Sequence, residues 1–144
     1  MHGYVVDFVS PRGGRVPFSL DVDEADPPGM VSYTIKYEGF RRKANQTLTP
    51  EQIEADDYVA AYIGGGGGSL FDVADDQRLL PIIAQIYKDG GVIGAGGHGP
   101  GSLGNVKLAN GQYLVAGKRA TGLYELQRTK QQVDQGWRAV TVFP

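Results

Sequence analysis

Two glycine-rich segments carry the residues of this chain that could do chemistry. The first, residues 64–68, is an unbroken run of glycine, and the second, residues 94–99, reads Gly-Ala-Gly-Gly-His-Gly. Such loops bring backbone amides close to a ligand, which suits phosphate groups and oxyanions. His98 adds an imidazole, the side chain best suited to proton transfer near neutral pH. Each segment follows an apolar run, so both are expected where a buried strand ends.

Three interpretations of the second segment compete. It satisfies the dinucleotide-binding pattern G-x-G-x-x-G, but glycine makes up 22 of the 144 residues, so chance matches are frequent. The acidic residue expected about 20 positions further on is also missing. Lys118 and Arg119 stand there instead. The second interpretation is a strand-to-helix elbow of the kind that presents a nucleophile, and the third is purely structural. In the structural interpretation His98 bonds to loop carbonyls and the glycines serve close packing.

Composition excludes several functions. The chain has no cysteine, which removes disulfides, thiolate nucleophiles and thiolate metal sites. With only His2 and His98, no metal site and no cofactor are expected. A net charge of −2 without a basic block gives no support to nucleic-acid binding. The sequence contains no apolar run of about 18 residues and no signal-peptide pattern, so we expect a cytoplasmic protein without membrane partners.

Alternating strand and helix patterns must position these loops. Residues 58–63 and 92–95 are continuous apolar runs, typical of parallel strands buried on both faces. Between them an apolar stripe at helical spacing predicts a helix. Its members are Leu79, Ile82, Ile83, Ile86 and Tyr87. Asp75 or Asp76 can cap its start, Asp89-Gly90-Gly91 can end it, and Pro81 could loosen its first turn.

The remaining elements are shorter. Strands are predicted at residues 4–9, 113–115 and 137–143, and helices near 103–108 and 125–135. Thr49-Pro50-Glu51-Gln52 predicts a short helix with a capping box, whereas residues 20–45 look irregular. Asn110-Gly111 predicts a turn. The order of these elements indicates an α/β fold with a parallel sheet.

The order and spacing of three segments resemble the ThiJ/PfpI superfamily of glutamine-amidotransferase-like proteins, which includes glyoxalase III-like members. These segments are HGYVVDFVSPRGGRVP, YIGGGGGSLFD and IYKDGGVIGAGGHGPGSLGNVKLANGQYLVAGKRATG. The resemblance implies one domain over residues 1–144, with a flavodoxin-like (Rossmann-like) three-layer sandwich and a mainly parallel sheet. It also implies that the sheet is truncated or rearranged at both ends, because the family's first strand and helix would precede Met1.

The family's active centre does not carry over. Family members usually read A-V-C-H-G-P at the elbow, where this chain has Ala-Gly-Gly-His-Gly-Pro, so Gly97 stands at the nucleophile's position. The histidine of the family's G-G-H-G loop corresponds to Gly67. Many members carry a glutamate pair after their T-G-F motif, and residues 127–128 are Gln-Arg here. Of the usual constellation only His98 remains.

Covalent catalysis needs a nucleophile beside a base, so the hemithioacetal route that the resemblance implies is closed at Gly97. His98 could still act as an acid or base if Asp72 or Glu125 oriented it. Glycine amides at the elbow could still bind an oxyanion. The candidate ligand-binding residues are Gly66, Gly67, Gly68, Gly97 and Gly99.

Our leading hypothesis is a cysteine-less pseudo-enzyme that binds a small ligand or acts as a scaffold. The alternative is an enzyme, of lyase or hydratase type, that uses His98 for non-covalent acid–base chemistry on a small carbonyl compound. A third hypothesis is a fragment or engineered form without activity. A missing first strand would leave residues 4–9 unpaired, so we also expect a homo-oligomer, a dimer in which strands are exchanged.

Overall fold

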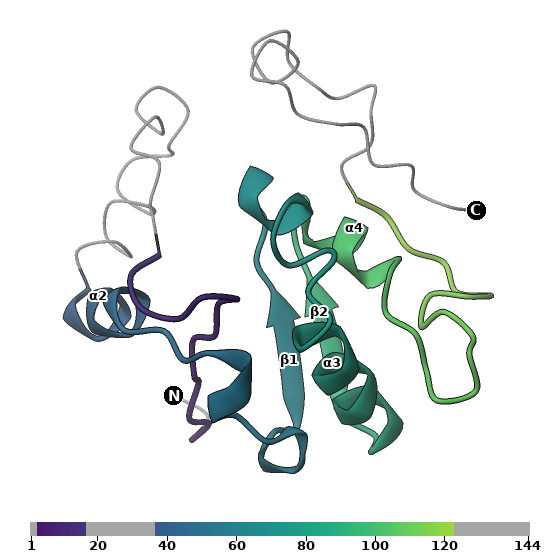
Figure 1. Cartoon of the computed structure of the whole chain (residues 1–144), viewed down its shortest axis with the longest axis horizontal. Coiled ribbons are helices and arrows are strands. Elements are labelled where there is room, and N and C mark those ends of the chain that lie inside the picture. The colour runs from purple at the N-terminus through teal and green to yellow at the C-terminus, as the bar shows by residue number, and fades with distance from the viewer. Residues whose placement is uncertain (1–2, 17–36, 123–144) are drawn as a thin grey trace, which may run out of the picture. The chain divides into compact units, whose positions relative to one another are not determined.

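The computed structural model describes residues 3–16 and 37–122. The chain forms two compact units, Met1–Ile53 and Glu54–Pro144 (Figure 1). The predicted helix near 125–135 and strand at 137–143 lie outside the described residues. The assignment of the whole chain to one domain stays a prediction.

The second unit is built on two parallel strands, β1 (Ala60–Ile63) and β2 (Val92–Ala95). Ile63 lies opposite Ala95, so both strands end at the same level and at the same edge. Helix α3 (Leu79–Lys88) connects them and packs against both (Figure 1). This is the parallel strand–helix–strand unit that the sequence predicts, and the α/β class is confirmed.

The apolar stripe of α3 makes the core of this unit. Its buried residues are Leu79, Leu80, Ile83, Ala84 and Ile86. Leu80, Ile83 and Ala84 form one cluster with Ile63 of β1 and with Val106 and Leu114 from the chain after β2. The helix ends as predicted. Gly90 adopts a φ of 87°, and the Gly91 amide donates to the Ile86 carbonyl at 2.8 Å, which satisfies one of the last carbonyls of the helix.

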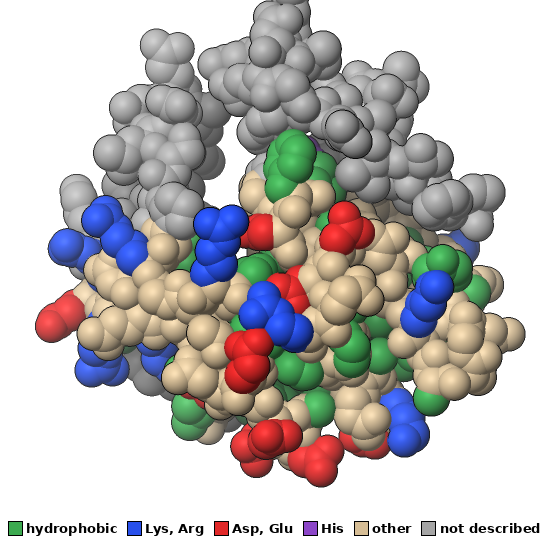
Figure 2. Space-filling view, in the orientation of Figure 1, with side chains coloured by type: hydrophobic (Ala, Val, Ile, Leu, Met, Phe, Trp, Pro, Cys, Tyr) green, Lys and Arg blue, Asp and Glu red, His purple; other side chains and the backbone are tan. Residues whose placement is uncertain are grey.

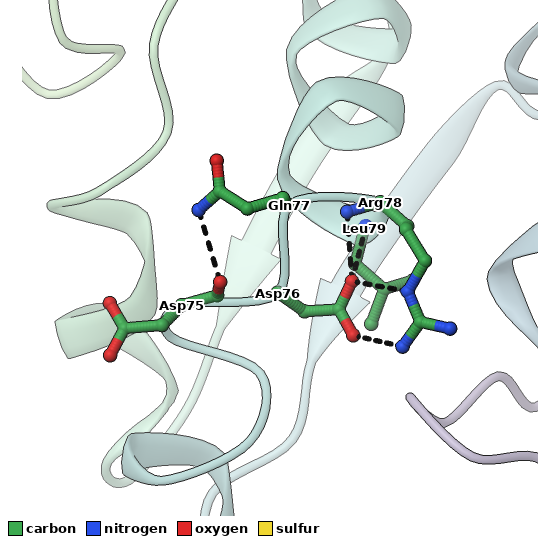
Figure 3. Close-up of polar contacts among 5 residues, drawn as sticks. All are labelled: Asp75, Asp76, Gln77, Arg78 and Leu79. Atoms are coloured by element: carbon green, nitrogen blue, oxygen red, sulfur yellow. Dashed lines mark hydrogen bonds and ion pairs between the residues drawn. The ribbon is translucent and has the colours of Figure 1, made fainter.

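Asp76 caps the start of α3 (Figure 3). Its Oδ1 accepts hydrogen bonds from the backbone amides of Arg78 and Leu79 at 2.8 and 3.1 Å. The Arg78 side chain donates to both carboxylate oxygens, through Nε at 3.2 Å and Nη2 at 2.6 Å. The hydrogen bonds from Arg78 outweigh the effect of burial and lower the pKa of Asp76. Pro81 is the third residue of α3, and the helix continues through it, with the preceding Leu80 amide donating to the Asp76 carbonyl at 3.1 Å.

The strands of this unit are covered on one face only within the described residues. Ala61, Ile63, Ile93 and Ala95 are buried or half-buried, whereas the alternate residue Tyr62 of β1 is 73% exposed. The expectation that both strands are buried on both faces is therefore wrong. The apolar run of β1 contains two alanines and a tyrosine, and hydropathy alone does not separate a bare face from a covered one.

Two predicted elements after β2 lie elsewhere or are shorter. The helix predicted near residues 103–108 is instead α4 (Gly99–Leu103), which begins directly after the elbow because Pro100 suits a first helical turn. The strand predicted at 113–115 is reduced to a single antiparallel bridge between Lys107 and Tyr113. The turn between them forms as predicted, with Gly111 at a φ of 81°.

The first unit contains a helix that sequence reasoning missed. Residues 38–45 form α2 (Glu38–Asn45), inside a stretch expected to be irregular. The capping box at Thr49 is confirmed: the Thr49 amide donates to Gln52 Oε1 at 2.8 Å, at the start of a 3-10 helix, η1 (Pro50–Gln52). Charged residues fill the exposed face of α2 and hide its weak apolar stripe, of which Ala44 is buried.

Residues 4–9 do not form the predicted strand. Val9 makes one parallel bridge to Leu48, and the preceding Tyr4 and Val5 are 76% and 84% exposed. A strand needs a paired neighbour along its length, and among the described residues only the end of this segment has one. The expected homo-oligomer stays a prediction. None of the helices in the described part of the chain is long and apolar enough to cross a membrane.

Candidate functional site

The candidate site is the elbow between β2 and α4, beside the loop that follows β1. After β2, the chain passes through Gly96 and Gly97 and enters α4 at His98. Gly97 adopts a φ of 55°, a left-handed conformation that costs glycine little. Gly97 is therefore the exposed apex of a sharp strand-to-helix turn. This turn lies at the carboxyl edge of the sheet, where ligands of α/β folds bind.

Close backbone packing holds the elbow against the loop after β1. The Gly96 amide donates to the Ile63 carbonyl at 3.1 Å. A Cβ on Gly65 would stand 2.9 Å from the Gly96 carbonyl oxygen, and one on Gly97 would stand 3.3 Å from the Gly65 Cα. The two glycine segments therefore meet, as their common place at strand ends predicts.

Two serines fasten the elements that follow these loops, and sequence reasoning missed them. Ser69 lies in a 3-10 helix, η3 (Gly67–Leu70), and its Oγ donates to the Gly66 carbonyl at 2.9 Å. Ser102 of α4 is fully buried, and its Oγ donates to the Ser69 carbonyl at 3.0 Å. Serine is common in glycine-rich loops, so the sequence alone does not show which serines make structural hydrogen bonds.

The predicted site residues separate into two groups. Gly66 and Gly97 lie in the two adjoining loops, and half-buried His98 follows Gly97 directly. Gly67 and Gly68 begin η3, and Gly99 begins α4. Asp72 follows η3, and its backbone amide donates to the Gly68 carbonyl at 3.0 Å while its side chain is exposed. The role of Asp72 as a partner that orients His98 stays a prediction. Glu125 lies outside the described residues.

Tyr62 is a further residue of the elbow that the sequence did not single out. The register places it opposite Gly94 of β2. A Cβ on Gly94 would stand 3.1 Å from its Cδ2 atom, and a Cβ on Gly96 would overlap its hydroxyl. The ring therefore lies along these two glycines. The alternation of small and large residues across two strands is the signal that could have revealed it.

One group of acidic side chains in this unit lies at the end of the sheet opposite to the elbow (Figure 2). Figure 2 shows acidic side chains gathered at the lower end of the view, over the turn that holds the 3-10 helix η2 (Ala55–Asp57). Glu54, Asp56 and Asp57 are exposed there, before the amino end of β1, whereas the elbow follows the carboxyl ends of the strands. Within the described residues, no three histidine, aspartate or glutamate side chains are placed to hold a metal ion.

Comparison with known proteins identifies relatives among glyoxalases. The chain is 33% identical over 135 residues to the glutathione-independent glyoxalase HSP31 of Saccharomyces cerevisiae, covering 92% of this chain and 57% of that protein. It is 32% identical over 128 residues to the probable glutathione-independent glyoxalase SNO4 of the same yeast, covering 84% of this chain and 52% of the relative. The chain thus spans about half the length of these curated relatives. No family model matches it.

Solved structures share the fold. The Rapid Encystment Protein REP24 of Francisella tularensis superposes with a TM-score of 0.76 and 25% identity, over 94% of this chain and 58% of that one. Glyoxalase III of Candida albicans shares the fold with a TM-score of 0.62 at 23% identity, over 76% of this chain and 48% of its own. These neighbours confirm the flavodoxin-like architecture that the sequence resemblance implies. The relatives that the chain matches are glyoxalase III-like proteins of the ThiJ/PfpI superfamily, and the chain is similar to them in sequence and in fold.

Proposed function

We propose that this chain is a small-carbonyl-binding domain of the glyoxalase III-like kind that does not catalyse by a cysteine nucleophile. The observation that carries the proposal is Gly97. It occupies the exposed apex of the elbow with the left-handed φ of 55°, so the backbone that would present a nucleophile is formed while the side chain is absent. The printed names of the relatives, glutathione-independent glyoxalases, support a small carbonyl compound as the ligand class.

Exposed backbone amides supply the binding chemistry. Gly64, Gly65 and Gly66 of one loop and Gly97 of the other are solvent-exposed, and their packing leaves no side chain between a ligand and the backbone. A carbonyl oxygen is a hydrogen-bond acceptor and an amide N–H is a donor, so such a loop pair suits a polarised carbonyl group.

The half-buried His98 supports a second candidate function. His98 follows the apex directly, and imidazole is the side chain best suited to proton transfer near neutral pH. A histidine so placed could move a proton at the carbon beside a bound carbonyl, without forming a covalent bond. This enzyme would be of lyase or hydratase type, and its activity would depend on His98 and not on residue 97.

Turnover of methylglyoxal by four proteins separates these functions. The proteins are the wild type, Gly97→Cys, Gly97→Ala and His98→Ala, and lactate formation is the readout. Gly97→Ala is the matched control, because both variants place a Cβ 3.3 Å from the Gly65 Cα and both adopt a strained φ, at a cost of about 1 kcal/mol. We expect lactate from Gly97→Cys alone, since only that variant supplies a thiol.

Binding is measured in parallel with hydroxyacetone, a carbonyl compound that lacks the reactive aldehyde. We expect backbone amide signals of residues 64–68 and 96–99 to shift in nuclear magnetic resonance spectra of the wild type. Wild-type turnover that His98→Ala abolishes would replace the proposal with the acid–base enzyme. A wild type that neither binds hydroxyacetone nor gains activity through Gly97→Cys would overturn it.

A further inference from the structure

We propose that Tyr62 determines the ligand specificity of the elbow by donating a hydrogen bond from its hydroxyl to an oxygen of the bound carbonyl compound. This inference rests on the proposed function and adds a side chain to a site otherwise made of backbone. The juxtaposition that carries it is the Tyr62 ring along Gly94 and Gly96, immediately before the apex at Gly97.

The direction of the ring follows from two contacts. Its Cδ2 atom lies beside Gly94, where a Cβ would approach to 3.1 Å. Its hydroxyl lies beside Gly96, where a Cβ would overlap it. Because Gly94 lies in β2 and Gly96 follows the last residue of this strand, the ring points toward the carboxyl end of β2. The Tyr62 hydroxyl therefore lies beside Gly96, the residue that precedes Gly97.

The ring takes its place because neither Gly94 of β2 nor Gly96, directly after the strand, has a side chain. Glycine within a strand weakens it, and often marks a place where another group approaches closely. Here the group is the Tyr62 ring, at both Gly94 and Gly96. Packing of the ring explains the two glycines, and a phenylalanine would pack in the same way. The hydroxyl is the part of Tyr62 that packing does not require.

The hydroxyl is available to a ligand. Tyr62 is 73% exposed, and no hydrogen bond joins its hydroxyl to another residue of the described part of the chain. A phenolic hydroxyl both donates and accepts, so it can bond to a carbonyl oxygen or to a neighbouring hydroxyl of the ligand. With amides of the glycine loops on the carbonyl, the site would favour compounds that carry oxygen on two adjacent carbons.

Titration with hydroxyacetone tests this role in the wild type, Tyr62→Phe and Tyr113→Phe, followed by amide chemical shifts. Tyr62→Phe keeps the ring on the two glycines, so its fold is preserved, and Tyr113→Phe removes another exposed tyrosine hydroxyl of the same unit. We expect Tyr62→Phe to raise Kd about 5-fold, the effect of one net hydrogen bond. The Kd of Tyr113→Phe should equal that of the wild type.

A second variant approaches the same hydroxyl from the opposite strand. Gly96→Ala leaves Tyr62 in the sequence but places a methyl group where its hydroxyl lies, so it should displace the ring and raise Kd similarly. Wild-type binding that Tyr62→Phe leaves unchanged would overturn this inference and leave the proposed function standing. Absence of wild-type binding would instead contradict the proposed function, and the role of Tyr62 with it.

Discussion

Removal of the Asp76 carboxylate should destabilise the second unit by an amount that depends on pH. The Asp76 side chain is 6% exposed and accepts the amides of Arg78 and Leu79 as well as the Arg78 guanidinium. Loss of an N-cap costs about 1 kcal/mol. The guanidinium is 48% exposed, so its ion pair adds only about 0.5 kcal/mol after screening by water. Asp76→Ala should therefore cost about 1.5 kcal/mol, which lowers Tm by roughly 6 °C.

Asp76→Asn separates charge from geometry. Its amide oxygen can still accept the two backbone amides, so we expect a smaller loss, about 0.5 kcal/mol near neutral pH. The folded protein lowers the pKa of Asp76 below its ordinary value of 3.8, chiefly through the hydrogen bond from Arg78. At a pH between the two values the unfolded state binds more protons, so the stabilisation by this carboxylate falls as the pH falls. The wild type and Asp76→Asn should therefore converge in stability as the pH drops below about 4.

Urea unfolding followed by circular dichroism measures these differences, with Asp75→Asn as the matched control. Asp75 is the neighbouring carboxylate, it is exposed, and its side chain makes one long hydrogen bond, from Asn105 at 3.3 Å (Figure 3 shows it directed away from the cap). We expect Asp75→Asn to match the wild type within about 0.3 kcal/mol. Equal losses for the two asparagine variants, or a loss for Asp76→Asn that does not change with pH, would refute the capping argument.

Two further substitutions test the packing beneath the elbow, both by urea unfolding. Gly99→Ala should cost about 3 kcal/mol, because its Cβ would overlap the Ile63 carbonyl oxygen. Gly64→Ala is its control and should stay within about 0.5 kcal/mol, since a Cβ there meets nothing within 4 Å. Ser102→Ala should cost about 1 kcal/mol, because it leaves the buried Ser69 carbonyl without the hydroxyl that now donates to it. A neutral Ser102→Ala would show that the bond from the Ala74 amide, at 3.0 Å, is enough to satisfy this carbonyl.

The parts of the fold that follow from local patterns were predictable from the sequence. The apolar stripe of α3, its glycine stop and its aspartate cap depend on residues a few positions apart. The stop and the cap are confirmed, and three of the five predicted stripe residues, Leu79, Ile83 and Ile86, are buried. Helix α2 was missed because its exposed face is charged and only Ala44 is buried. Residues 4–9 have the composition of a strand, but pairing depends on a distant neighbour that composition does not supply.

The candidate site also contains features that the sequence predicts and features that it does not. The meeting of the two glycine segments follows from the rule that parallel strands end at one edge, and the contact between Gly65 and Gly97 agrees with it. The hydroxyl of Tyr62 was not foreseen, because its place depends on the register of β1 against β2. The bond from Ser102 to Ser69 joins residues 33 positions apart, and serine carries no marker for such a partner.

The packing of α4 against the end of β1 has a consequence for engineering. Gly99 rests directly on the carbonyl groups at the end of β1, so main-chain atoms on both sides set the orientation of the helix and of the apex before it. Side chains around the apex can then be exchanged without changing the direction in which residue 97 points. The backbone of the elbow therefore fixes the direction of any side chain introduced at residue 97. A cysteine, a serine or another reactive residue at this position would point in one defined direction from the carboxyl edge of the sheet.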